Sequence, residues 1–362
     1  MANIHDVAKM AGVHRSTVSR VLTGKGSSSE KSRKKVIAAA RKLNYHINTV
    51  ASALKSQRKT AIGFLSFWNC SPNPSEAYYQ QTLTGIIDGI TRSQYHLVLN
   101  NIQGLAHQEN EELKFIHESL LAGLILMAPR TKEADLAFLK DLNIPSLLLY
   151  YRTDDPDYSY IDLDNRKGAQ MAVDYLVGLG HRRIGFIGGE IELSSNARDR
   201  YTGYQRSLKK AGIPEDPNLV HQRAFSYEEG REGVKRFLML PKEKRPTAIF
   251  CSTDNMAVGA MDAIQDSGLK VPADISVVGF DDYFQALNFR PVITTGQQSS
   301  VHYEQSGGGY PDLTTIRQPF YHIGQKSVEV LEAMIEGPGG KKHVLVEPEL
   351  RVRQSTAPPS KD

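Results

Sequence analysis

Short β-rich runs alternate with helical patterns along residues 60–362, and this alternation restricts that part of the chain to α/β folds. Strand-like runs occur at Ala61–Phe67, His96–Asn101, Gly123–Met127, Ser146–Tyr150, Tyr160–Leu163, Arg183–Gly188, Ala248–Cys251 and Ser276–Phe280. Helical patterns lie between most of them, for example at Gly168–Leu179, Arg200–Ala211, Glu229–Leu240 and Met256–Ser267. Such alternation predicts parallel sheets built of βαβ units. Because about 300 residues are many for one such sheet, we predict two doubly wound α/β subdomains with a cleft between them.

The first sixty residues follow a different, helical pattern. Apolar residues recur at helical spacing in two short stretches that Gly12 separates, namely Ile4, Val7, Ala8 and Ala11, then Val18, Val21 and Leu22. A third helix is predicted over Glu30–Leu43. Two short helices joined by a tight turn with a small residue predict a helix–turn–helix unit.

Charge is distributed unevenly between these two parts. Residues 1–60 contain 13 Lys or Arg and 2 Asp or Glu, a net charge of +11, whereas the whole chain carries only +4. A basic helix face is ordinarily a solvated surface. Beside a helix–turn–helix unit, however, the excess favours binding to nucleic acid phosphates.

The N-terminal sequence resembles the DNA-binding headpiece of the lac repressor family. The matching run extends from Ile4 to Leu22 and continues through Leu43-Asn44-Tyr45 and Asn48–Leu54. The resemblance implies that Arg15, Ser16 and Arg20 contact base edges in the major groove, where Arg can bind guanine through two hydrogen bonds. It also implies that Ser19, Lys31, Tyr45 and Asn48 contact the DNA backbone.

The segment Asn48–Ser56 resembles the hinge helix of the same family. In that family the residues that match Ala53, Leu54 and Lys55 lie in the minor groove, with the leucine wedged between base steps. The alternative for Leu54 is an ordinary leucine on a helix face. Because helices shorter than about 12–15 residues are marginal in water, we predict that this one forms only when it is held on DNA.

The remainder of the chain resembles the periplasmic-binding-protein-like core of the family. The matching phrases are Asp162-Asp164-Asn165, Gly180-His181, Ile184–Gly189 and Asp274–Asp281. The resemblance implies that an effector contacts Tyr78, Tyr79, Arg200, Phe225, Thr253, Asp254 and Asp281. Alternative roles are open for three of these residues, because Tyr78 and Phe225 suit a hydrophobic core and Asp254 suits a helix N-cap.

The expected effector is a sugar or a sugar derivative. Arg and Asp supply the hydrogen-bond donors and acceptors that sugar hydroxyls require, and aromatic rings cover the apolar face of a sugar ring. A purine or a nucleoside is the alternative within the same fold. Residues 292–310 depart from the family pattern, and we interpret them as either a local duplication or a mobile inserted surface loop rich in Gln, Ser and Gly.

Other classes of protein are disfavoured by the sequence. His117-Glu118 lacks the second histidine of a zinc-protease helix, and Gly340-Lys341 lacks the spacing of a phosphate loop, so neither an enzyme, a metal nor a cofactor is expected. The longest apolar run has nine residues, whereas a membrane span needs about 20. Two cysteines, both expected in the core, and the lack of a recognisable export signal are typical of a cytoplasmic protein. These observations count against an exported solute-binding protein, and the two carboxylates of the first sixty residues are too few for a nucleic-acid-processing enzyme.

We therefore predict a ligand-controlled transcription regulator that binds double-stranded operator DNA. The expected divisions are a helix–turn–helix domain at residues 1–46, a hinge helix and linker at 47–59, and an effector-binding and dimerisation core at 60–362. Since one helix–turn–helix contacts only a half-site, a homodimer is expected.

Overall fold

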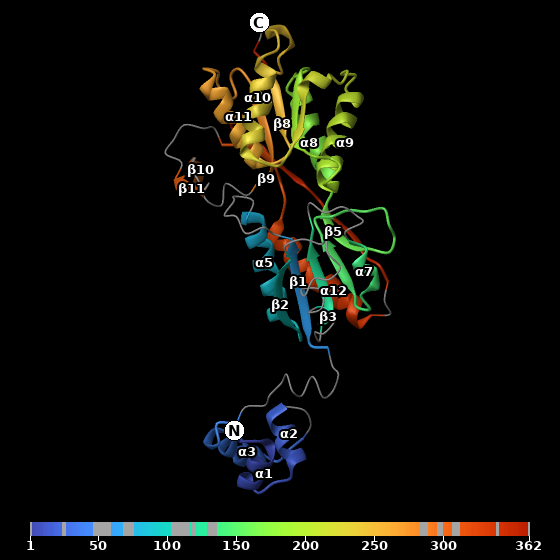
Figure 1. Ribbon diagram of the computed structural model, residues 1–362, viewed down its shortest axis with the longest axis vertical. Coiled ribbons are helices and arrows are strands. Elements are labelled where there is room, and N and C mark those ends of the chain that lie inside the picture. Colours follow the sequence, from blue (N-terminus) through green and yellow to red (C-terminus); the bar gives the residue numbers. More distant parts are fainter. Residues whose placement is uncertain are drawn as a thin grey trace. The chain divides into compact units, whose positions relative to one another are not determined.

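The computed structural model divides into two compact units, residues 1–60 and 61–362 (Figure 1). The residues that it describes are 2–23, 27–45, 59–67, 76–102, 116, 121–128, 136–282, 289–294, 300–305, 312–337 and 340–360. Within these ranges, no helix combines the length and the hydrophobicity that a membrane span requires.

The first unit is a three-helix domain made of α1 (Ile4–Ala11), α2 (Arg15–Thr23) and α3 (Glu30–Lys42). Asn3 begins α1 with a capping box that Asp6 completes, and Ser29 caps α3. Gly12 ends α1 with a left-handed φ of 64°, which a glycine adopts without the steric cost of a side chain. The three helices enclose a small core of buried side chains, namely Val7, Ala8, Ala11, Val18, Val36, Ala39 and Ala40.

The second unit contains two six-stranded sheets. The first has the strand order β13-β5-β4-β3-β1-β2, and all its pairs are parallel. Its strands are β1 (Ala61–Phe67), β2 (His96–Ile102), β3 (Leu121–Met127), β4 (Ser146–Leu149), β5 (Ser159–Leu163) and β13 (His343–Val346). Helices α5 (Glu76–Thr91) and α12 (Phe320–Glu336) pack against each other and cover one face, and α7 (Phe138–Asp141) lies on the other.

The second sheet has the strand order β14-β12-β9-β8-β6-β7 and is parallel except for its edge strand β14. Its strands are β6 (Ile184–Gly189), β7 (Val220–Arg223), β8 (Ala248–Cys251), β9 (Ser276–Asp281), β12 (Thr314–Arg317) and β14 (Glu349–Arg351). Helices α8 (Asn165–Gly178) and α9 (Ser195–Lys210) pack together on one face, and α10 (Tyr227–Leu238) and α11 (Asp254–Asp266) pack together on the other (Figure 1).

Short connections lead from one sheet to the other between β5 and α8, between β12 and α12, and between β13 and β14. The first and third are joined by a hydrogen bond of 2.9 Å from the amide of Asp164 to the carbonyl of Val346. Val346 also contacts the hydrophobic cores of both halves. These connections therefore bring the carboxyl ends of β5 and β12 to the junction of the two sheets.

The predicted α/β fold with two subdomains is confirmed, and the predicted runs coincide with strands or helices within a few residues. The pattern did not single out β7, β12, β13, β14, α5 or α12. Of the two cysteines, Cys251 is buried in β8 as expected, and Cys70 lies outside the described residues.

Residues 292–310, for which the sequence left open a local duplication or a mobile inserted surface loop, include paired strands. Strand β10 (Phe289–Thr294) pairs antiparallel with β11 (Ser300–Gln305). Both segments contain the β-branched or aromatic residues that favour paired strands, among them Val292, Ile293, Val301 and Tyr303. Val292–Thr294 is therefore part of an antiparallel strand pair.

Candidate functional site

One face of α2 is polar and exposed. Arg15, Ser16, Ser19 and Arg20 lie on it, and Val18 on the opposite face is completely buried. The side-chain Nε of Arg20 donates to the backbone carbonyl of Ser16 at 3.3 Å, and the two terminal guanidinium nitrogens take no part in this bond. A helix with donors and hydroxyls on one exposed face has the form that major-groove recognition needs.

The described basic side chains of α1, α2 and α3 show no acidic partners. Within residues 2–23 and 27–45, no Lys or Arg forms an ion pair. Lys31 is exposed in the first turn of α3, and Tyr45 is half-buried against the three-helix core. The positive charge is therefore available to an anionic polymer. Asn48, Ala53, Leu54 and Lys55 lie outside the described residues.

In the second unit, a buried polar cluster centres on Arg200. The Nε of Arg200 donates to Oδ1 of Asn165 at 2.8 Å, and its Nη1 donates to the carbonyl of Ser252 and lies 3.6 Å from Oδ1 of Asp281. The guanidinium also lies over the ring of Phe280, with its Cζ 3.8 Å from the ring centroid. Because Arg200 is only 3% exposed, these contacts fix its orientation.

Three buried carboxyl groups belong to this region. Burial raises the pKa of Asp162 to about 7, although the amides of Leu163 and Asn165 donate to it. Burial also raises the pKa of Asp254, and the neighbouring charge of Asp281 adds to that effect. The pKa of Asp281 is raised by burial as well, against the opposing influence of Arg200. The charge of Arg200 thus acts on two of these carboxyls, Asp162 and Asp281.

The strands position this cluster at one edge of the second sheet. Asp281 is the last residue of β9, Ser252 directly follows β8, and Gln318 directly follows β12. Asp281 has a φ of 125°, a backbone conformation that side-chain-bearing residues rarely adopt and that occurs mainly at functional sites. The carboxyl edge of parallel strands is the usual place for ligands in open α/β sheets.

Thr253, rather than Asp254, is the N-cap of α11. The hydroxyl of Thr253 accepts from the amide of Met256 at 3.2 Å. The alternative role for Asp254 as a cap is therefore wrong. Its carboxylate instead accepts a hydrogen bond from the hydroxyl of Thr315 on β12 at 2.5 Å, because the helix begins one residue before the position that the alternative assumed.

The three aromatic candidates are divided between the two halves. Tyr78 on α5 contacts Tyr150 and Phe320 with ring centroids 6.0 and 5.9 Å apart, and Tyr79 stacks on Phe64 at 5.9 Å. Both tyrosines are half-buried against the core of the first sheet. Phe225 packs against the second sheet, where a Cβ on Gly189 would lie 2.3 Å from its ring. These three rings therefore pack against the hydrophobic cores, whether or not they also contact a ligand.

Two family models match this chain. One, described as bacterial regulatory proteins of the lacI family, matches residues 3–48, and the other, a periplasmic binding protein-like domain, matches residues 173–356. The regulatory protein RegA of Clostridium saccharobutylicum is 32% identical over 98% of this chain and 99% of its own length. The chain belongs to the lacI family.

Solved structures of lacI-family proteins share the same fold. A structure of the lac repressor dimer, bound to operator and an anti-inducer, is 31% identical with a TM-score of 0.78, and the match covers 98% of this chain and 99% of that one. A structure of the regulator CelR in complex with cellobiose is 26% identical with a TM-score of 0.67, and the match covers 98% and 100%. This lacI-family chain is therefore a DNA-binding transcriptional regulator.

Sequence reasoning did not place several residues of this lacI-family site. Asn165 lies in a phrase that matches the family, but nothing in its spacing indicated that it contacts Arg200, and no sequence signal indicated that Gln318 contacts Asp281. Tyr150 has a φ of 58°, is buried, and its hydroxyl lies 2.6 Å from that of Thr82. Burial is the main cause that raises the pKa of Tyr150, and the charges of Asp162 and Asp281 add to it.

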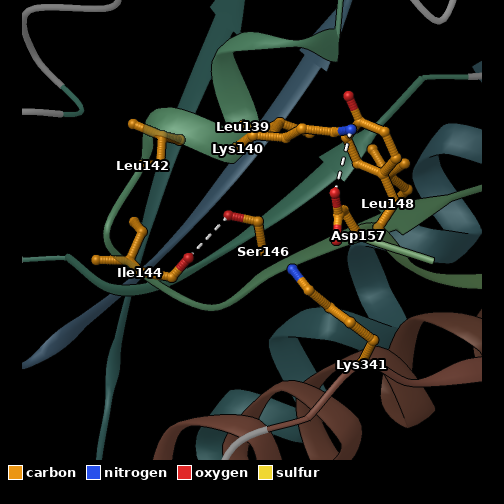
Figure 2. Close-up of a pocket in the computed structure, with 9 residues that line it drawn as sticks. Leu139, Lys140, Leu142, Ile144, Ser146, Leu148, Asp157 and Lys341 are labelled. Atoms are coloured by element: carbon orange, nitrogen blue, oxygen red, sulfur yellow. Dashed lines mark hydrogen bonds and ion pairs between the residues drawn. The ribbon is translucent and has the colours of Figure 1, made fainter. Parts of the chain in front are cut away.

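A separate cavity of about 240 Å³ lies in the first sheet near the amino-terminal ends of β4, β5 and β13, whereas the Arg200 cluster lies at the carboxyl ends of the strands of the second sheet (Figure 2). Leu139, Leu142 and Ile144 line it, and its rim includes Lys140 and Lys341. Lys140 forms ion pairs with Asp155 at 2.6 Å and Asp157 at 3.4 Å. None of the predicted effector residues lines this cavity. Across the described part of the chain, no cluster of His, Cys, Asp and Glu side chains is arranged to hold a metal ion.

Proposed function

We propose that this lacI-family protein is a repressor that binds operator DNA as a homodimer and releases or retains it according to a bound sugar. Arg15, Ser16 and Arg20 contact bases, whereas Ser19, Lys31, Tyr45 and Asn48 contact the backbone. The exposed polar face of α2 and the unpaired basic side chains around it support this assignment. Because one such headpiece contacts a half-site, two copies are needed for an operator.

The domain organisation that we propose has three parts. Residues 1–46 bind the major groove, 47–59 form the hinge with Ala53, Leu54 and Lys55 in the minor groove, and 60–362 bind the effector and dimerise. The division of the structure after Thr60 supports the last boundary. A repressor of carbohydrate-utilisation genes acts where the operator is, in the bacterial cytoplasm.

The sugar assignment depends chiefly on two buried acceptor oxygens. Oδ1 of Asn255 and Oε1 of Gln318 accept no hydrogen bond from any described residue, although the two residues are 5% and 6% exposed. A buried polar atom without a partner is costly, and a ligand or water usually satisfies it. Gln318 contacts a buried carboxyl, since its side-chain amide donates to Asp281 at 2.6 Å, and Asn255 lies in the first turn of α11 next to Asp254 in the sequence.

A site with these groups is suited to hydroxyl donors. Carboxylates and amide oxygens accept from hydroxyls, and Arg200 supplies donors. The complex of the similar CelR structure with cellobiose also supports a sugar. A purine or nucleoside is the alternative ligand, because aromatic rings such as Phe225 also stack on bases.

Calorimetry on the full chain tests the ligand with a panel of mono- and disaccharides, purines and nucleosides. We expect a sugar to bind and to change operator affinity in fluorescence anisotropy. Asp281→Asn and Gln318→Ala remove groups of the cluster and should weaken sugar binding at least tenfold, whereas Asp157→Asn, at the opposite edge of the first sheet, should not. Binding of purines in place of sugars would refute the sugar assignment. Lack of preference for any DNA sequence would refute the operator assignment.

A further inference from the structure

The recognition face of α2 contains a hydrogen-bonded pair, His14 and Ser16, that the proposed function does not explain. His14 directly precedes α2 and occupies its N-cap position, where its carbonyl accepts from the amides of Thr17 and Val18. Its ring Nδ1 lies 2.9 Å from the hydroxyl oxygen of Ser16 and 3.3 Å from the backbone nitrogen of Ser16. The imidazole thus caps the helix in the way that a Ser or Asn side chain ordinarily does.

The hydrogen bond from the Ser16 amide determines which ring nitrogen of His14 carries a proton and which way the Ser16 hydroxyl points. A backbone N–H can only donate, so the amide of Ser16 donates to Nδ1, and Nδ1 carries a lone pair. An unprotonated Nδ1 cannot donate to the Ser16 hydroxyl, and therefore the hydroxyl donates to Nδ1. The neutral ring then carries its proton on Nε2. The single hydroxyl hydrogen of Ser16 is thereby used inside the protein, and only the lone pairs of its oxygen remain for DNA.

We propose that His14 makes Ser16 an acceptor-only contact, so that Ser16 selects adenine or cytosine over guanine or thymine on the strand that it contacts. In the major groove, adenine and cytosine present an amino group, whereas guanine and thymine present a carbonyl oxygen. A free serine hydroxyl donates or accepts and so tolerates all four bases. The inference depends on the proposed operator binding and adds a specificity-determining residue, His14, that itself touches no base.

Arg20 complements this preference. It lies four residues after Ser16, on the same helix face, and its Nε is bonded to the Ser16 carbonyl at 3.3 Å. Its terminal nitrogens carry only donors, which suit the N7 and O6 acceptors of guanine. Ser16 therefore presents an acceptor beside the donors of Arg20, and the half-site is expected to combine a guanine with a nearby adenine or cytosine.

Selection from a random duplex library tests the inference, because it requires no known operator. The full chain is compared with Ser16→Ala, His14→Ala, His14→Asn and, as a matched control on α1, His5→Ala. The position that loses its preference in Ser16→Ala is the Ser16 position. There the unaltered protein should enrich adenine or cytosine by about fivefold, the effect of one net hydrogen bond.

In His14→Ala the enrichment of adenine or cytosine at the Ser16 position should fall close to one, because the Ser16 hydroxyl is then free to donate. His14→Asn should restore it, since its side-chain oxygen can cap the helix and accept from the hydroxyl. His5→Ala should leave it unchanged, and the Arg20 position should keep its guanine in all these variants. Circular dichroism checks that α2 remains folded.

Three outcomes would overturn the inference while leaving operator binding intact. They are guanine or thymine at the Ser16 position, an unchanged preference in His14→Ala, and no position at all that responds to Ser16→Ala. If the unaltered chain enriches no sequence, the proposed function itself fails.

Discussion

Arg20 and Lys31 illustrate how two exposed cations on neighbouring helices are expected to differ. Arg20 lies on the recognition face of α2, and Lys31 lies in the first turn of α3. A donor pair aimed at a base edge discriminates sequences, whereas an ammonium beside a phosphate attracts all sequences alike.

Arg20→Ala should therefore relax base preference at one operator position by about 1–3 kcal/mol. Lys31→Ala should weaken binding to all sequences equally and lower the slope of log affinity against log salt by about one. Anisotropy titrations on operator and scrambled duplexes over a range of salt concentrations measure both effects. Uniform loss of affinity in both variants would contradict the assignment of Arg20 to base recognition.

The buried carboxyls predict how stability depends on pH. The ordinary Asp pKa is 3.8, the folded pKa of Asp162 is about 7, and those of Asp254 and Asp281 are raised as well. At a pH between the unfolded and the folded pKa, each of these carboxyls is protonated in the folded chain and ionised in the unfolded chain. The contribution of these three carboxyls to stability should therefore be fully present below about pH 4 and be lost as the pH rises through the folded pKa values, by at most about 1.4 kcal/mol per pH unit for each carboxyl.

Asp254→Asn should flatten this dependence, because a neutral amide replaces a carboxyl whose ionised form is disfavoured. Urea unfolding between pH 5 and 8 measures the change. Asp274→Asn, which alters an exposed carboxyl, is the control and should keep the slope of the unaltered protein. An equal slope in all three proteins would show that Asp254 is ionised throughout this range.

At the scale of the element, Gly12 allows the turn between α1 and α2. Its φ of 64° is left-handed, and a Cβ added there would meet no atom within 4 Å, so the cost of Gly12→Ala is backbone strain alone. We expect the headpiece to lose about 1–2 kcal/mol. Amide exchange in α1 and α2 reports this loss. Gly178→Ala, which also has free space but a helical backbone at the end of α8, should leave amide exchange in α8 no faster.

The hinge segment at residues 48–56 is an element whose helix we propose to be conditional. A helix of this length is marginal alone, so its amides should exchange freely in the free protein and be protected on operator. Leu54→Ala should reduce operator affinity and DNA bending together, and it should leave sugar affinity unchanged. Protection of Val50–Leu54 in the free, sugar-bound protein would refute coupled folding.

For the whole molecule, the predicted dimer relates the headpiece to its DNA. Two headpieces on a symmetric operator should bind at least a hundredfold more tightly than on a duplex with a single half-site, because the second contact becomes intramolecular. Sedimentation should show a dimer at micromolar concentration. A monomer with equal affinity for both duplexes would contradict this expectation.

The sequence by itself determined those features that depend on residues close together in the chain. Helix periodicity and Gly12 predicted α1 and α2, and the alternation of apolar runs and helices predicted two parallel sheets. Short sequence segments that match the lac repressor family indicated the family. Local propensity and spacing are sufficient for such features, since a few neighbouring residues decide them. The family resemblance implied that Arg200 and Asp281 contact an effector, but it did not indicate that they contact each other.

Only the tertiary structure decided how distant residues meet. Asp281 reaches Arg200 because β9 lies beside β8 and β8 beside β6, and Gln318 reaches Asp281 because β12 lies beside β9. Strand order depends on the packing of the whole sheet, which no local pattern encodes. For the same reason Tyr78 was found to contact Tyr150 and Phe320, and Asp254 to accept from Thr315. The contact of His14 with Ser16, two residues apart, is among those that local sequence could have indicated.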